Sequence, residues 1–247
     1  MPRPLACAAA VLALAWTALG TLPAQAQQPA DDKARIEQIV RDYLLRNPEV
    51  IVEAMRELEL REQRARIEMQ RRGLSEHRNE IFQDPDAPVM GNPQGDVTLV
   101  EFFDYQCGYC KSVFPDLQRL MQADGKVRVV LKELPILGPA SIVAAKASLA
   151  AQKQGKYAPF HNTLMGLRGP LDEDKIFRAA QSVGLDVARL KTDMEAPEIT
   201  AQIERNLQLA EDLQINGTPA FIAGDRLIPG AVPLDRLMEL VRAQRAG

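Results

Sequence analysis

The pair formed by Cys107 and Cys110 is the part of the sequence best suited to chemistry. The segment Cys107-Gly108-Tyr109-Cys110 follows an apolar run at residues 97–103 and precedes a stretch whose apolar residues recur at helical spacing. On the first turn of a helix, cysteines three residues apart can close a small disulfide ring, and the first lies against free N–H groups at the positive helix end. We therefore expect Cys107 to be the attacking thiolate and Cys110 to be the deeper, resolving thiol.

Two structural roles compete with this redox interpretation of the pair. A closed zinc site needs four ligands, and apart from the pair the segment after residue 26 offers only His77 and His161, which lie far apart in the sequence. A permanent structural disulfide with a two-residue gap closes almost no loop and adds little stability through chain entropy. Both alternatives are weaker than the redox interpretation, and no metal or other cofactor is expected.

A second segment, residues 216–221, places turn-forming residues before Thr218-Pro219 and a short apolar strand. On its own, such a Thr-Pro pair indicates an ordinary strand entry. Together with the upstream strand, CxxC and helix, it resembles the thioredoxin-like folds, in which a cis-proline lies against the disulfide and the preceding residue pairs with an extended substrate. An X–Pro bond keeps the cost of the cis form low. Thr218 and Pro219 are therefore candidate substrate-binding residues.

Glu101 is the third candidate, a lone acid inside the apolar run. Charged side chains are rarely fully buried unless they are paired. If Glu101 lies beneath the cysteines, desolvation should raise its pKa and let it relay a proton to or from Cys110. The alternative is an edge-facing Glu101 that pairs with Lys132 on a neighbouring strand, and both roles could hold together.

Composition and the N-terminus indicate an exported globular protein. The 247 residues are 46% apolar and 26% charged, with a formal net charge of −3, which excludes a disordered chain and gives no reason to expect a nucleic-acid partner. Residues 1–26 combine Arg3, an Ala/Leu-rich stretch and Ala24-Gln25-Ala26, the pattern of a cleaved secretory signal. Its removal takes away Cys7, so the remaining two of the three cysteines share one motif in an oxidising compartment, the periplasm.

Residues 27–84 predict a helical arm followed by a charged stalk. Apolar residues recur at helical spacing from Ile36 to Leu44, and Asn47-Pro48 then starts a second helix with its own apolar stripe. Residues 56–80, the stalk, are dense in alternating charge, and Gly73 is a predicted stop or hinge. Two short helices cannot bury such a stripe alone, so we expect self-association, with folding back onto the main domain as the alternative.

Residues 85–247 predict a compact α/β domain. Turn-rich segments mark a boundary near residue 85, and strands are expected at residues 97–103, 127–131, 219–222 and 226–228. Between the second and third strands, about residues 139–213, the pattern is mostly helical, and a helix at residues 234–242 follows the last strand. This order describes a small mixed sheet with a large helical insertion.

With these motifs in place, residues 88–245 resemble the DsbA-like branch of the thioredoxin superfamily, in which a helical domain is inserted into the thioredoxin fold. The likeness rests on residues 102–111 around the CxxC and on Gly217-Thr218-Pro219-Ala220-Phe221. It implies a thioredoxin-like fold and a thiol–disulfide oxidoreductase acting on exported proteins with cysteines. It also places Glu101 where that family keeps a buried acid.

Residues 34–85 are similar to the N-terminal region of ScsC-type proteins, suppressors of copper sensitivity, on the residues Ile39 to Val50. In some members of that group this region oligomerises, including as a trimer. The resemblance therefore implies a homo-oligomer, with a trimer favoured and a dimer possible.

The Gly108-Tyr109 dipeptide departs from the Pro-His of the strongly oxidising DsbA members and also occurs in the dimeric isomerase DsbC. Tyr109 supplies no imidazolium to stabilise the Cys107 thiolate, and a less stabilised thiolate gives a less oxidising disulfide. We therefore expect a disulfide isomerase with a membrane redox partner, DsbD-like if reducing. The alternatives are a monomeric oxidase with a DsbB-like partner and a Cu(I)-binding copper-tolerance protein.

Overall fold

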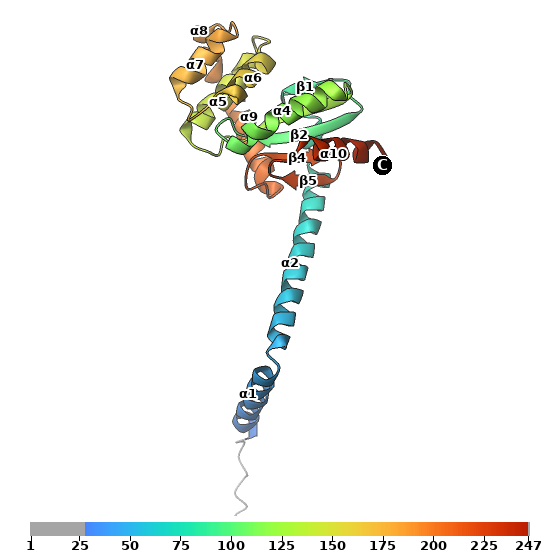
Figure 1. Ribbon diagram of the computed structural model, residues 1–247. Coiled ribbons are helices and arrows are strands. Elements are labelled where there is room, and N and C mark those ends of the chain that lie inside the picture. The colour runs from blue at the N-terminus through green and yellow to red at the C-terminus, as the bar shows by residue number, and fades with distance from the viewer. Residues whose placement is uncertain (1–27, 247) are drawn as a thin grey trace, which may run out of the picture. The chain divides into compact units, whose positions relative to one another are not determined.

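The computed structural model describes residues 28–246 (Figure 1). The predicted signal, residues 1–26, lies outside the described residues. The chain divides into two compact units, one ending at Leu60 and the other beginning at Arg61. No described helix combines the length and apolar composition needed to cross a bilayer.

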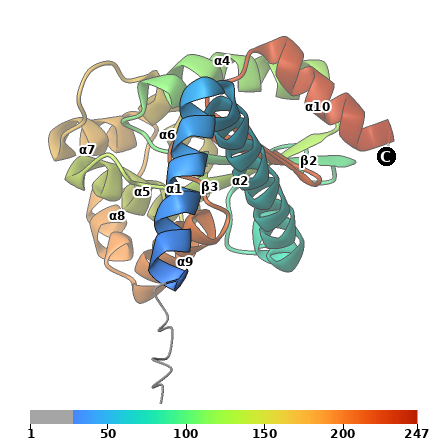
Figure 2. The ribbon, with the colours of Figure 1, turned by 90° about the horizontal axis from the view of Figure 1, so that it is seen from below.

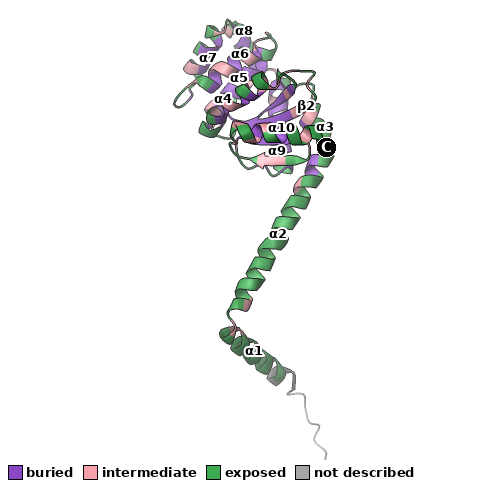
Figure 3. Cartoon of the chain, turned by 45° about the vertical axis from the view of Figure 1, so that its right-hand side comes forward, coloured by how far each residue is buried: buried purple, intermediate pink, exposed green. Residues whose placement is uncertain are grey.

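The first unit holds one helix and the first part of a second, and most of their apolar side chains are exposed. Helix α1 spans Gln28–Arg46 and helix α2 spans Glu49–Glu76, separated at Asn47 and Pro48 as the sequence predicts. Exposure is visible along α1 and most of α2 in Figure 3. Nine apolar side chains of the unit are between 47% and 71% exposed: Ile36, Ile39, Val40, Tyr43, Leu45, Ile51, Val52, Met55 and Leu58.

Gly73 does not stop the helix, so that prediction is wrong. Helix α2 continues through it to Glu76, and both Gly73 and Leu74 are buried. A Cβ at Gly73 would lie 3.2 Å from Leu213 Cδ2, and the missing side chain lets the helix approach the end of α9 closely. His77, just beyond α2, lies 3.6 Å through Nε2 from Asp212 Oδ2. The last turns of α2 therefore pack as part of the second unit.

The second unit is built on a five-stranded mixed sheet in the order β1-β3-β2-β4-β5. Central β2 (Val97–Phe103) runs parallel to β3 (Val127–Glu133) and antiparallel to β4 (Ala220–Ala223). The edges are β1 (Val89–Gly91), antiparallel to β3, and β5 (Arg226–Pro229), antiparallel to β4. Both faces of β2 are covered, which explains its nearly continuous apolar run.

Helices cover the two faces of this sheet. Helix α4 (Gly108–Ala123) and helix α10 (Leu234–Ala246) pack beside each other on one face (Figure 2). Helix α3 (Arg78–Phe82) and helix α9 (Pro197–Asp212) contact β2 and β3, respectively, on the other face. Because successive side chains of a strand point to opposite faces, the sheet has two hydrophobic cores, one on each side.

The predicted helical insertion is confirmed between β3 and β4. It consists of α5 (Pro139–Gln152), α6 (Tyr157–Gly166), α7 (Glu173–Ser182), α8 (Val187–Met194) and α9. Alanine-rich α5 packs against the other four helices. Its small side chains permit this close approach on several sides, and eight of its residues are buried.

Strand β1 is not predicted by the sequence, and α3, which begins within the predicted helical stalk, is a separate helix after His77. Ile81 of α3 is fully buried and packs in the same core as Val100 and Phe102 of β2. The turn near residue 85, expected as a domain boundary, is followed by Ala87, which belongs to that core as well. Residues 74–87 therefore contribute to the packing of the second unit.

Candidate active site

The two cysteines lie where the sequence predicts, at the start of a helix that follows the central strand. Cys107 is the N-cap of α4, with extended backbone angles, and Cys110 lies in the first turn. Both are free thiols, close together, with Cys107 6% exposed and Cys110 fully buried. Of the two thiols, only Cys107 therefore reaches the surface, as the attacking and resolving roles expected of the pair require.

The structure brings Thr218 and Pro219 to the same point, although they lie more than a hundred residues away in the chain. The Thr218-Pro219 peptide bond is cis, and the Cys107 thiol donates a hydrogen bond of 3.1 Å from Sγ to the Thr218 carbonyl oxygen. Pro219 is buried and leads into β4, while Thr218 is half-buried. The predicted substrate-binding segment thus touches the sulfur of Cys107.

Glu101 is buried completely, on the sheet face beneath α4. Its neighbours in the alternation, Leu99 and Phe103, belong to the core cluster that contains Cys107 and Cys110. Both carboxyl oxygens lack a hydrogen-bond partner among the described residues. Burial raises the pKa of Glu101 to about 8. Burial, followed by the charge of Glu101, raises the pKa of Cys110 well above its usual value.

The alternative pairing of Glu101 with Lys132 is wrong. Lys132 lies in β3, and its side chain is almost fully buried. Its ammonium group pairs with Asp84 Oδ2 at 2.5 Å. Burial lowers the pKa of Lys132, and the hydrogen bond that Lys132 donates to Asp84 opposes that effect. In the parallel register Glu101 lies opposite Leu131, and adjacent strand residues face opposite sides. The ammonium group of Lys132 therefore stabilises the turn near residue 85 and forms no hydrogen bond with Glu101.

The dipeptide between the cysteines is open to solvent. Gly108 begins α4, and a Cβ there would meet no atom within 4 Å. Tyr109 is 71% exposed, which leaves its ring free beside the thiol pair. The dipeptide therefore forms part of the exposed surface beside the thiol pair, and it supplies no cationic side chain to Cys107.

Asp104, which the sequence reasoning did not single out, fixes the turn before Cys107. Its Oδ1 accepts hydrogen bonds from the Gln106 N–H and the Ser141 hydroxyl, and its Oδ2 accepts the N–H groups of Ile136 and Leu137, all at 2.7–2.9 Å. The Asp104 carbonyl accepts the N–H of Cys107. One buried carboxylate thus links the CxxC turn to the start of the helical insertion. Its position three residues before Cys107 is the only signal in the sequence.

A second group missed by the sequence reasoning is a buried network around Tyr105. The Tyr105 hydroxyl lies within hydrogen-bond distance of Glu133 Oε1, Ser148 Oγ and His161 Nδ1. Tyr157 donates a second hydrogen bond to the same Glu133 oxygen. Burial raises the pKa of Glu133 well above its usual value and lowers that of His161 to about 3. These groups join β3, α5 and α6 directly behind the CxxC turn.

Among the described residues, no group of three or more His, Cys, Asp and Glu side chains could hold a metal ion. Lys111, the residue after Cys110, donates a hydrogen bond of 2.6 Å to the Leu167 carbonyl oxygen. Burial, with nearby Lys175, lowers the pKa of Lys111. This hydrogen bond links the first turn of α4 to the end of α6.

Comparison with protein families finds two matches along the chain. Residues 98–242 match the DSBA-like thioredoxin domain, and residues 32–65 match the copper resistance protein ScsC N-terminal domain. The first match includes the CxxC, the helical insertion and Thr218-Pro219. The second covers α1 and the first part of α2.

Several known proteins are similar to this chain over part or most of its length. A thioredoxin-like oxidoreductase from Silicibacter pomeroyi is 50% identical, with a TM-score of 0.68, over 69% of this chain and 98% of its own. A linker-deletion mutant of Proteus mirabilis ScsC is 29% identical, with a TM-score of 0.69, over 90% of this chain and 99% of its own. The Na(+)/H(+) antiporter NhaA of Herminiimonas arsenicoxydans is 29% identical over 66% of this chain, but the match spans only 27% of the antiporter.

Proposed function

This chain belongs to the DsbA-like thioredoxin-domain family, and from that premise we propose that it is an oligomeric protein disulfide isomerase of the periplasm. The observation that carries the proposal is the contact of 3.1 Å between the Cys107 sulfur and the Thr218 carbonyl, next to an exposed Gly-Tyr dipeptide. The substrates are exported proteins with non-native disulfides.

We assign the attack on substrate to Cys107, the thiol at the surface. Its thiolate attacks one sulfur of a substrate disulfide, so that a mixed disulfide forms and the second substrate sulfur leaves as a thiolate. In isomerisation another substrate thiolate then attacks and releases Cys107, and no net oxidation occurs. If release is slow, Cys110 attacks Cys107, which frees the reduced substrate and leaves the pair as a disulfide.

Glu101 is proposed to exchange a proton with Cys110 during that second route. A thiol as buried as Cys110 must lose its proton before it can attack, and the raised pKa of Glu101, about 8, makes its carboxylate a stronger base than that of an ordinary glutamate. A Glu101→Gln variant should resolve mixed disulfides more slowly, and its rate should lose the pH dependence around 8. Rates that match the wild type across pH would contradict the relay.

The isomerase assignment, rather than oxidase, is supported by the dipeptide and by the arm. Neither Gly108 nor Tyr109 offers a cation to stabilise a Cys107 thiolate, and a weaker thiolate makes the disulfide less oxidising. A monomeric oxidase has no need of an arm. Several active sites on one oligomer hold a misfolded substrate while its disulfides are exchanged.

Self-association is proposed to occur through α1 and the first part of α2. Nine of their apolar side chains are about half exposed or more, and most of the stability of a protein helix comes from packing its apolar face. The ScsC N-terminal match covers the same residues. We favour a trimer, with a dimer as the alternative.

The arm is tested by one charged substitution on its apolar face. Ile39→Asp should dissociate the oligomer in light scattering and lower the rate at which a scrambled disulfide substrate regains activity. Reduction of insulin by the same variant should persist, because that reaction needs only the thiol pair. A dissociated Ile39→Asp protein that isomerises as fast as the wild type would overturn the role of the arm.

Ala34→Asp is the matched control for this experiment. It places the same new charge on the same helix, about 140° away from Ile39 around the axis. Ala34 is exposed, and the control should remain oligomeric. Dissociation of both variants would mean that charge on α1, rather than the apolar face, governs association.

Export and redox partners belong to the same proposal. Residues 1–26 are proposed as a cleaved signal, residues 27–84 as the arm and stalk, and residues 85–247 as the catalytic domain. An isomerase must be kept reduced, which requires a DsbD-like membrane reductant, whereas an oxidase would need a DsbB-like oxidant. Thiol trapping in cells separates the two, since a mainly oxidised pair at rest would favour the oxidase.

Copper binding is a second candidate function, favoured by the closeness of the two thiols and by the ScsC match. Cu(I) is a soft ion that two thiolates can bind. Titration of the reduced protein with Cu(I) should show one site that is lost in Cys110→Ser. Binding that persists in that variant, or no binding at all, would remove this candidate.

A further inference from the structure

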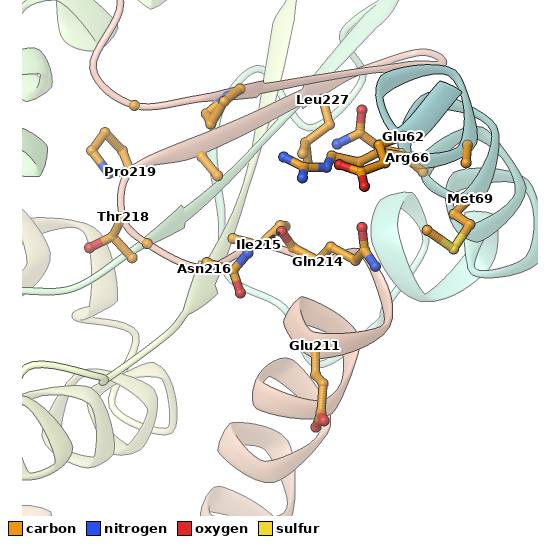
Figure 4. A pocket seen from close by; sticks show the side chains of 16 residues that line it. Glu62, Arg66, Met69, Glu211, Gln214, Ile215, Asn216, Thr218, Pro219 and Leu227 are labelled. Atoms are coloured by element: carbon orange, nitrogen blue, oxygen red, sulfur yellow. Dashed lines mark hydrogen bonds between the residues drawn. The ribbon is translucent and has the colours of Figure 1, made fainter. Parts of the chain in front are cut away.

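A large groove begins at the cis-proline segment and ends on helix α2, within the second unit. It encloses about 980 Å³. Thr218 and Pro219 lie at one side, Met69 lies at the other, and Gln214 and Leu227 lie between them (Figure 4). The groove is thus continuous with the segment that touches the Cys107 sulfur.

One face of α2 forms the far wall. The residues that line the groove from this helix are Glu62, Ala65, Arg66, Met69 and Gln70. Their spacing of three and four places them on a single side of the helix. The wall is held in position by the buried Leu74 and by the close approach of Gly73 to Leu213. The stalk therefore contributes to this surface rather than acting only as a spacer.

The lining fits an extended polypeptide better than a compact small molecule. The apolar side chains of Met69, Ile215 and Leu227 line the groove together with the charged side chains of Glu62 and Arg66. The volume lies at the upper limit of ordinary ligand pockets. Neighbouring β5 is an edge strand of the sheet, the kind of edge at which proteins hold extended peptides.

We propose that this groove binds the polypeptide segment that flanks the substrate cysteine, and that Arg66 and Met69 of the stalk select among substrate sequences. The inference rests on the proposed attack by Cys107. A residue four or five positions from the attacked cysteine lies about 13–17 Å away in an extended chain. Contacts made there would discriminate among substrates without touching the reacting sulfur.

The test follows formation of the mixed disulfide in full-length Cys110→Ser protein, so that the Cys107 adduct accumulates. The probes are mixed disulfides of thionitrobenzoate with glutathione or with 11-residue peptides that carry a central cysteine and either Glu or Lys flanks. The Cys107 thiolate attacks the sulfur of the peptide or of glutathione, and the coloured thionitrobenzoate anion leaves. Stopped-flow absorbance gives the rate constant for each probe.

Arg66→Glu should slow the reaction of the Glu-flanked peptide by about threefold to fivefold and speed that of the Lys-flanked peptide, as expected for exchanging one exposed attraction for repulsion. Arg64→Glu is the matched control, because it carries the same charge change two residues away on a different side of α2 and outside the groove. Met69→Ala should slow both peptides relative to Ile67→Ala, an exposed apolar control on the same helix.

Each outcome bears on one of the two proposals. If no probe reacts through Cys107, the proposed function fails. If the probes react but Arg66→Glu and Arg64→Glu behave alike, the groove does not bind the flanking segment. If Arg66→Glu alters the glutathione probe as much as the peptides, its effect falls on the thiol itself and the groove inference is overturned.

Discussion

Replacing Glu101 by glutamine should stabilise the reduced protein progressively as the pH rises from 4.5 to 8. Burial raises the pKa of Glu101 from 4.5 to about 8, so between these values the unfolded chain has lost a proton that the folded protein keeps. The folded state then binds more protons, and its stability falls as the pH rises. Glutamine does not ionise, so the variant escapes this loss.

The magnitude follows from the interval between the two pKa values. Each pH unit in that interval is worth about 1.4 kcal/mol. The variant should therefore gain about 3 kcal/mol relative to the wild type at pH 7 and roughly 5 kcal/mol above pH 8. The buried amide of glutamine adds a cost that does not change with pH. The slope of the difference, rather than its absolute value, therefore tests the reasoning.

Urea unfolding of both reduced proteins from pH 5 to 8.5, without oxygen, measures this slope. His161 contributes with the opposite sign, since burial lowers its pKa to about 3 and the unfolded chain takes up a proton as the pH falls below 6.5. That contribution is present in both proteins and cancels in the difference. If the difference in the free energy of unfolding between the two proteins stays constant across this pH range, the raised pKa of Glu101 is refuted.

Substitutions at three places test the site and its support. Cys110→Ser should accumulate a mixed disulfide with peptide substrates through Cys107, detected by mass spectrometry. If adducts form only in Cys107→Ser, through Cys110, then Cys110 is the attacking thiol and Cys107 the resolving one. Ile81→Ala should lower the free energy of unfolding, measured in urea, by about 2–5 kcal/mol because Ile81 is fully buried. A loss below about 1 kcal/mol would contradict the packing of α3 in the core. Lys132→Met should cost about 3 kcal/mol because it leaves Asp84 unpaired, and a second change, Asp84→Asn, should recover most of the loss.

The features that the sequence predicts best depend on local signals. The CxxC after a buried strand and the helical insertion at residues 139–213 follow from neighbouring residues alone. The contact between Cys107 and Thr218 lies outside this class, because it joins segments 111 residues apart. It was anticipated only through a family resemblance, in which both motifs occur together.

Features that depend on distant packing could not be predicted in this way. Gly73 resembles a helix stop, but its role is to let α2 approach Leu213, which lies 140 positions later. Asp104 and Tyr105 carry no distinguishing spacing, since their partners Ile136 and His161 are remote in sequence. Buried polar side chains generally have a hydrogen-bond partner, and for these residues the partner is brought close only by the folding of the chain.

Glu101 shows why an apolar run conceals the position of a functional acid. In a strand covered on one face, alternation would reveal which side Glu101 takes, but β2 is apolar on both faces and carries no such signal. The register with β3 and β4, where Glu101 lies opposite Leu131 and Phe221, settles the question. A shift of one residue would turn Glu101 toward the core of α3 and α9, away from Cys110. The proposed proton exchange therefore depends on strand pairing as much as on the residue itself.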